Sequence, residues 1–140
     1  MKFTWTGEVS ADVGRRYVAV CSLISEKFDE AAAKGEVPEE DSEIHFCPVV
    51  MKEEWIKNYP ARSRVDKRSG IFYCAPHLDY NIFLNGDFRS QLENTILTIA
   101  SELHRLKKLG LDEESIGKVR NLFLEMLDQD PDSPRFTART

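Results

Sequence analysis

The apolar positions of the first third change from a period of two to a helical period. In residues 2–9, apolar side chains occupy alternate positions and polar side chains occupy the positions between them, which predicts a half-buried strand. Between residues 13 and 33, apolar side chains recur at spacings of three and four. This pattern predicts a long amphipathic helix that ends near Gly35, with Ser10 or Asp12 as its N-cap.

The middle third has the patterns of strands separated by polar turns. Residues 43–52 have strand character, and Pro48 predicts an edge position or a bulge because proline cannot donate to a strand ladder. Residues 62–75 are expected to form a hairpin around a Lys-Arg-Ser-Gly turn. Residues 53–61 fit a helical turn or an irregular segment, and residues 79–86 fit a strand end or a helical turn.

Two amphipathic helices are predicted in the last third. Apolar residues recur at spacings of three and four over residues 88–106, with Asp87 as the N-cap and Gly110 as the stop signal. Asp112 is then expected to cap a second helix, whose apolar face extends over residues 116–127.

The order of these elements predicts an α+β fold. We expect a small, mostly antiparallel sheet, with the long N-terminal helix and the two C-terminal helices packed on one face. A chain of 140 residues with 41% hydrophobic content suits a single domain over residues 1–130, followed by a short mobile tail at 131–140. No apolar run approaches the roughly 20 residues of a membrane span, and the start of the chain lacks an apolar signal segment. We therefore expect a cytoplasmic protein without a membrane partner.

Charge is distributed unevenly along the chain. The net charge is −5, which argues against nucleic acid as a partner. Residues 26–43 hold eight acids against two lysines, whereas residues 52–68 hold six bases against three acids. The acidic stretch fits either a solvated loop or a docking surface for a basic partner. Trp55 and Tyr59 lie outside the apolar periods. Each fits either an anchor of a protein interface or a side chain that covers the edge of the core. The candidate partner-binding residues are Glu36, Glu39, Glu40, Asp41, Glu43, Trp55 and Tyr59.

The sequence contains no catalytic motif. Cys21, Cys47 and Cys74 form no CxxC pair and are expected to be buried, reduced thiols. The glycines are scattered and metal-ligand pairs at fixed short spacing are missing, so neither a phosphate loop, a metal site nor a cofactor is expected. One alternative is a small enzyme that uses His77, Asp79 and Cys74 in a cleft, which requires these side chains to converge.

A second alternative is a structural subunit that self-associates through the apolar face of residues 88–106. The sequence leaves both a monomer and a dimer open.

The first fourteen residues, Met-Lys-Phe-Thr-Trp-Thr-Gly-Glu-Val-Ser-Ala-Asp-Val-Gly, resemble the start of a family of bacterial immunity proteins from polymorphic toxin systems. In that family a short strand ending in Gly-Glu-Val leads into a helix that begins Ala-Asp-Val. The similarity continues through residues 70–78 and into residues 88–110, which end in Lys-Leu-Gly. The resemblance implies a cytoplasmic protein that neutralises a cognate contact-dependent or secreted toxin domain by stoichiometric binding. It implies no catalysis and no cofactor, and it transfers no site residue.

Overall fold

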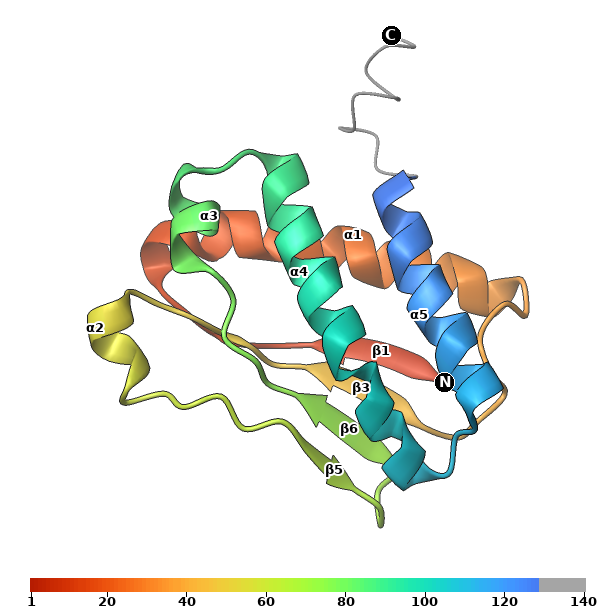
Figure 1. The fold of residues 1–140 in the computed structure, drawn as a ribbon. Helices are drawn as coiled ribbons and strands as arrows, with labels where there is room; N and C mark the ends of the chain where they lie inside the picture. Colours follow the sequence, from red (N-terminus) through yellow and green to blue (C-terminus); the bar gives the residue numbers. More distant parts are fainter. Residues whose placement is uncertain (129–140) are drawn as a thin grey trace, which may run out of the picture.

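The helices of the chain gather on one side of a four-stranded sheet, and the strands lie beneath them (Figure 1). The structure is a computed structural model that describes residues 1–128, so the tail predicted at 131–140 lies outside the described residues. The elements in chain order are β1 (Lys2–Trp5), β2 (Glu8–Val9), η1 (Ala11–Val13), α1 (Gly14–Ala33), β3 (Glu43–Phe46), β4 (Val49–Val50), α2 (Glu53–Ile56), β5 (Arg64–Asp66), β6 (Ile71–Cys74), α3 (Tyr80–Asn85), α4 (Phe88–Glu102), η2 (Leu103–Leu109) and α5 (Glu113–Asp128).

The main sheet is mostly parallel, so the prediction of a mostly antiparallel sheet is wrong. Its strand order is β1-β3-β6-β5, in which β1–β3 and β3–β6 are parallel and only β5–β6 is antiparallel. The reason is the helix between the first two strands. The 20 residues of α1 span about 30 Å, which returns the chain to the end of the sheet where it began. The predicted hairpin is confirmed as the β5–β6 pair.

Each of the first two predicted strands is split in two. β2 pairs with β4 in a second parallel ladder, and the amides of Thr6 and Glu8 donate to the carbonyl oxygens of Phe46 and Pro48 across the break. Pro48 lies at the second break, whereas β3 is a central strand, so the predicted edge position or bulge is wrong. Gly7 lies at the first break with φ +155°, where a Cβ atom would come within 2.8 Å of the Tyr17 hydroxyl oxygen. A glycine therefore lets α1 approach this turn closely.

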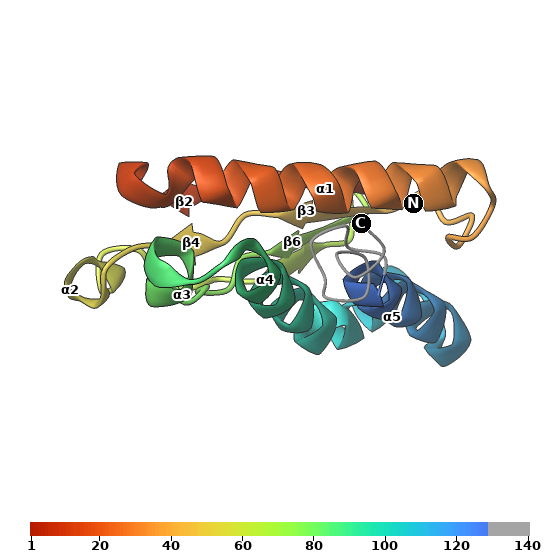
Figure 2. The same cartoon turned by 90° about the horizontal axis from the view of Figure 1, so that it is seen from above.

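The core lies between one face of the sheet and the helices. The ring centroid of Phe3 on β1 is 5.8 Å from that of Phe28 on α1 and 5.8 Å from that of Phe123 on α5. Phe28 and Phe123 are themselves 5.9 Å apart, so both helices cover the same face. Figure 2 shows α1 running along the molecule with α4 and α5 beside it. The α+β class, with three long helices on one face, is therefore confirmed.

The predicted helix starts are confirmed for the two C-terminal helices. The Ser90 amide donates to Asp87 Oδ1 at 2.8 Å, and the Ser115 amide donates to Asp112 Oδ1 at 2.8 Å. Neither Ser10 nor Asp12 caps α1, so this prediction is wrong: the Ser10 hydroxyl donates to Asp12 Oδ1 at 2.6 Å, and both residues belong to the turn η1 and its start, which precede the helix.

The end of the first C-terminal helix and the two open segments also have defined structures. The helix predicted over 88–106 continues as the 3-10 segment η2 and stops at Gly110, whose φ of +93° is the left-handed conformation of a helix end. The segments 53–61 and 79–86 each contain a short helix, α2 and α3. Within the described residues, no helix combines the length and the apolar character needed to cross a membrane.

Replacing Phe123 by Ala should lower the free energy of unfolding by about 3–5 kcal/mol, because its fully buried ring joins β1, α1 and α5. The neighbouring Leu124 is 36% exposed, so Leu124→Ala should cost less than about 1 kcal/mol. Urea unfolding followed by tryptophan fluorescence measures both values. Equal losses in the two variants would contradict this account of the core.

Candidate functional site

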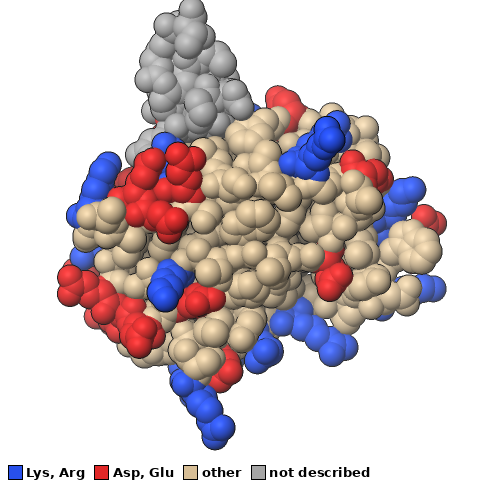
Figure 3. Space-filling view, turned by 180° about the vertical axis from the view of Figure 1, so that it is seen from behind, with Lys and Arg blue, Asp and Glu red and all other residues tan. Residues whose placement is uncertain are grey.

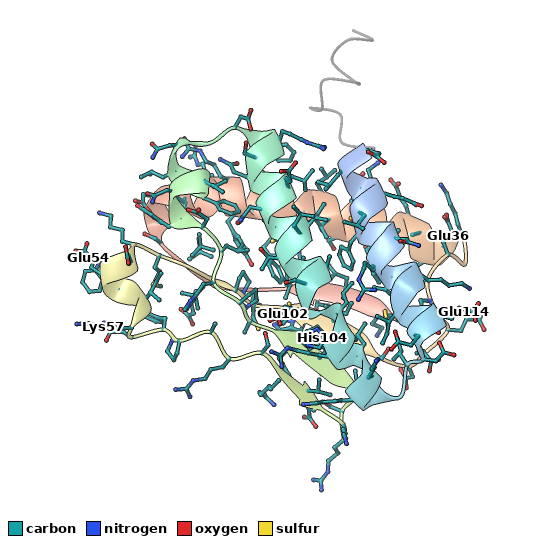
Figure 4. The ribbon with its side chains drawn as sticks, viewed as in Figure 1. Glu36, Glu54, Lys57, Glu102, His104 and Glu114 are labelled. Carbon is teal, nitrogen blue, oxygen red and sulfur yellow. The ribbon has the colours of Figure 1, made fainter. Side chains whose placement is uncertain are left out.

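The candidate partner-binding residues lie at two opposite ends of the molecule. Figure 4 shows Glu36 at one end and Glu54 and Lys57 of the α2 region at the other. Trp55 lies on α2 and Tyr59 follows it, so both belong to this second end. The candidates therefore do not form one continuous patch. The first end is the acidic loop between α1 and β3, which we define by Glu36, Glu39, Glu40 and Asp41.

The acidic loop faces basic residues across a cleft of about 320 Å³. Glu40 and Asp41 line this cleft together with Lys67, Arg68 and Lys108. The acidic and basic stretches of the sequence thus meet in space. Because the acidic loop is exposed, water screens these charges and leaves them available to a partner.

The α2 end exposes two aromatic side chains. Trp55 is 54% exposed and Tyr59 is 39% exposed, and no residue of α2 is buried. Trp55 therefore does not act as cover for the core edge. A hollow of about 570 Å³ lies between α2 and α3, and both apolar residues, such as Ile56 and Leu84, and charged residues, such as Glu53, line it. Exposed Trp and Tyr side chains are typical of the anchors of protein-contact surfaces.

A third surface is the face of the sheet that points away from the helices. Thr4 Oγ1 donates to Glu43 Oε2 at 2.6 Å and lies 2.8 Å from His45 Nδ1. Thr6 Oγ1 lies 3.0 Å from His45 Nε2. Because the Thr4 hydroxyl donates to Glu43, the Thr4 oxygen is available to accept a hydrogen bond from His45 Nδ1. Glu43 therefore belongs to this network rather than to the acidic loop.

Aromatic and cationic contacts extend this network across the sheet. The ring of Tyr73 on β6 meets the His45 ring edge to face, with centroids 5.8 Å apart. The Arg64 guanidinium carbon on β5 lies 4.1 Å from the centre of the Tyr73 ring. We call the residues of this network the open sheet face: Thr4, Thr6, Glu43, His45, Arg64 and Tyr73. Sequence reasoning missed this surface, because its residues come together only through the strand register.

The proposed enzymatic residues each have a separate structural role. Cys74 is fully buried, and burial raises the pKa of its thiol. His77 Nε2 lies 2.9 Å from the Tyr59 carbonyl oxygen, and Asp79 Oδ1 accepts from the Asn81 amide at the start of α3. Within residues 1–128, no group of three or more His, Cys, Asp or Glu side chains could hold a metal ion. The convergence that a cleft enzyme requires is therefore not found in this part of the chain.

The apolar face proposed for self-association is part of the core. Leu92, Ile96 and Ile99 of α4 and Leu103 of η2 are fully buried in the same cluster as the residues of α1 and α5. The outer side of α4 presents Leu97, which is 48% exposed, beside a shallow groove of about 740 Å³ between α3 and α4.

These features describe a small α+β protein whose exposed surfaces offer contact chemistry: an acidic loop, an aromatic end and an ordered open sheet face. The family comparison agrees with this class. The chain belongs to the Immunity protein 44 family, whose model matches residues 1–129. The resemblance to bacterial immunity proteins is therefore confirmed. No curated protein and no solved structure matches the sequence.

Burial predicts which thiols react in the native protein. It raises the pKa of Cys21 to about 12 and also raises those of Cys74 and Cys47, but Cys47 is only half-buried and the charge of Arg64 opposes the rise in its pKa. At pH 8, an alkylating reagent should modify Cys47 alone, and all three cysteines should react in denaturant. Peptide mass mapping measures this, with Cys47→Ser as the control. Rapid modification of native Cys74 would contradict the burial argument and restore the enzyme hypothesis.

Proposed function

We propose that this protein is an immunity protein that binds and neutralises a cognate bacterial toxin domain with one-to-one stoichiometry. The observation that carries the proposal is the match of the Immunity protein 44 family to residues 1–129. The separate structural roles of Cys74, His77 and Asp79 agree with a protein that acts by binding. The proposal includes a polymorphic toxin system as the source of the partner and a cytoplasmic location, because an immunity protein has to meet the toxin in the compartment it protects.

Neutralisation by binding makes two physical demands on the surface. A stable complex buries about 800 Å² on each partner around a few anchoring side chains, commonly Trp, Tyr or Arg. Rapid capture of the toxin also benefits from complementary charge, which raises the association rate. The exposed aromatic residues of the α2 end and the Tyr73–Arg64 stack meet the first demand, and the acidic loop meets the second.

Co-expression with the toxin-like domain encoded beside its gene should restore growth that the toxin domain alone abolishes. The two purified proteins should elute together as a one-to-one complex, since the proposed mechanism is stoichiometric. Growth curves and size-exclusion chromatography with light scattering measure these outcomes. Neither rescue nor a complex would overturn the proposed function.

Charge reversal in the acidic loop should slow association with a toxin domain that presents a basic surface. Glu39→Lys/Glu40→Lys should lower the association rate about tenfold at low salt and weaken its dependence on ionic strength. The control is Glu53→Lys/Glu54→Lys, which makes the same change in charge at the α2 end. Stopped-flow or surface-based kinetics measures both rates. A larger drop in the association rate of the control variant would show that the charged contact lies at the α2 end instead.

A further inference from the structure

We infer that the toxin domain docks on one side of the molecule, formed by the open sheet face together with the uncharged outer side of α1. This inference rests on the proposed function and specifies its binding surface. The outer side of α1 is represented by Val18, Ala19 and Ser22, which are all exposed. We call the combined surface the docking face.

The first observation is an uncovered sheet face. Strands β1, β3 and β6 are parallel neighbours, and sheets built from parallel strands are usually covered on both faces. Here α1, α4 and α5 cover one face, which carries Phe3, Ile44 and Phe72. On the other face, no helix of residues 1–128 packs against the network of Thr4, His45 and Tyr73 (Figure 1). The sheet thus lacks the cover that its strand direction normally requires.

The second observation is the missing charge on the outer side of α1. Residues 17–25 contain no charged residue, although the outer face of a surface helix is normally charged. Val18 is 47% exposed within this stretch, and Ala19 and Ser22 are also exposed. The uncharged stretch is about 13 Å long at the rise of an α-helix. An exposed apolar residue in an uncharged stretch fits the centre of an interface better than a solvated surface.

The two surfaces adjoin, because α1 packs on β1 and β1 is an edge strand of the sheet. Figure 3 views this side and shows few charged side chains across its middle. Acidic side chains gather at the left of this view and basic side chains along its lower margin. We define the acidic margin as the exposed Asp29 and Glu30 near the end of α1 together with the acidic loop, and the basic margin as the exposed Arg62, Arg64, Lys67 and Arg68 in and beside β5. A charge-depleted centre with a polar rim is the usual anatomy of a protein interface.

The charges of the two margins define the chemistry of the partner surface. The toxin surface should be uncharged at its centre, basic opposite the acidic loop and acidic opposite β5. Arg64 supports the last requirement. Its guanidinium stacks on Tyr73 and makes no hydrogen bond or ion pair within residues 1–128. The N–H groups of Arg64 can therefore form a bidentate pair with a carboxylate of the toxin.

The docking face is also ordered before binding, and only together with its charged margins does it approach the size of a stable interface. His45 is held at both ring nitrogens by Thr4 and Thr6, and Tyr73 is held between His45 and Arg64. Side chains that are already fixed lose little freedom on association. The four strands and the exposed side of α1 give a footprint of roughly 500 Å² from standard element dimensions. The charged margins extend this area toward the usual size of an interface.

The test compares two exposed apolar residues on opposite sides of the molecule. Val18 on α1 and Leu97 on α4 are 47% and 48% exposed, so replacing either by Arg should leave the fold intact. The toxin domain encoded beside the gene serves as the probe, made inactive or kept as the purified complex. Val18→Arg should weaken binding at least tenfold, whereas Leu97→Arg should change it less than twofold. Thr6→Arg provides a second variant, because it introduces a cation beside His45 at the β1 edge of the open sheet face.

Calorimetry and growth rescue of these variants give separate outcomes. Loss of binding in Val18→Arg and Thr6→Arg, with circular dichroism unchanged, supports the docking face. Wild-type affinity in both variants would overturn the docking face and leave the proposed function intact. A loss confined to Leu97→Arg or Trp55→Ala would also overturn it, and would assign the contact to the groove beside α4 or to the α2 end. A wild-type protein that binds no toxin domain overturns both inferences.

Discussion

The contact among Phe3, Phe28 and Phe123 is the interaction on which the rest of the structure depends. It joins the first strand, the long helix α1 and the last helix α5, because the centroids of the three rings lie about 6 Å from one another. Because these three elements come from the start, the first third and the end of the described chain, their contact closes the fold. It also draws α1 and α5 to the same side of the sheet, where α4 packs against both. The opposite side is left without cover, so the surface available to a partner is a direct consequence of how the core is formed.

Periodicity was sufficient to predict the helices, most of their ends and the α+β class, because these features depend on local spacing. Asp87 and Asp112 cap helices as their residue types and positions indicate. The direction of the strands was not predictable in the same way. A strand with one buried face alternates whether its neighbour is parallel or antiparallel. The useful signal was the 20-residue helix between β1 and β3, which is long enough for a parallel crossover.

The candidate functional surface was only partly predictable, for a related reason. The acidic loop is continuous in sequence, so a count of charges finds it. The open sheet face is assembled from β1, β3, β5 and β6, and Thr4 and Arg64 are 60 positions apart by their numbers. Each of its residues has the unremarkable pattern of the polar side of a strand. Only the register, which places Thr4 beside His45 and His45 beside Tyr73, turns them into a network. Glu43 illustrates the difference, since its sequence neighbours are acidic but its contact is Thr4.

The uneven distribution of charge along the chain has a physical consequence in this arrangement. An uncharged centre determines how long a complex lasts, because burial of apolar and pre-ordered side chains acts mainly on dissociation. Charged margins act mainly on the rate of encounter and on the choice of partner. On the proposed docking face, the acidic and basic margins border a centre with few charges, and they approach each other at the cleft that Glu40, Asp41, Lys67 and Arg68 line. A toxin surface of matching polarity would be favoured in one orientation and opposed in the reverse orientation. A uniformly acidic surface would attract any basic protein. Two margins of opposite charge beside the same contact would therefore give an immunity protein a means to select its own toxin.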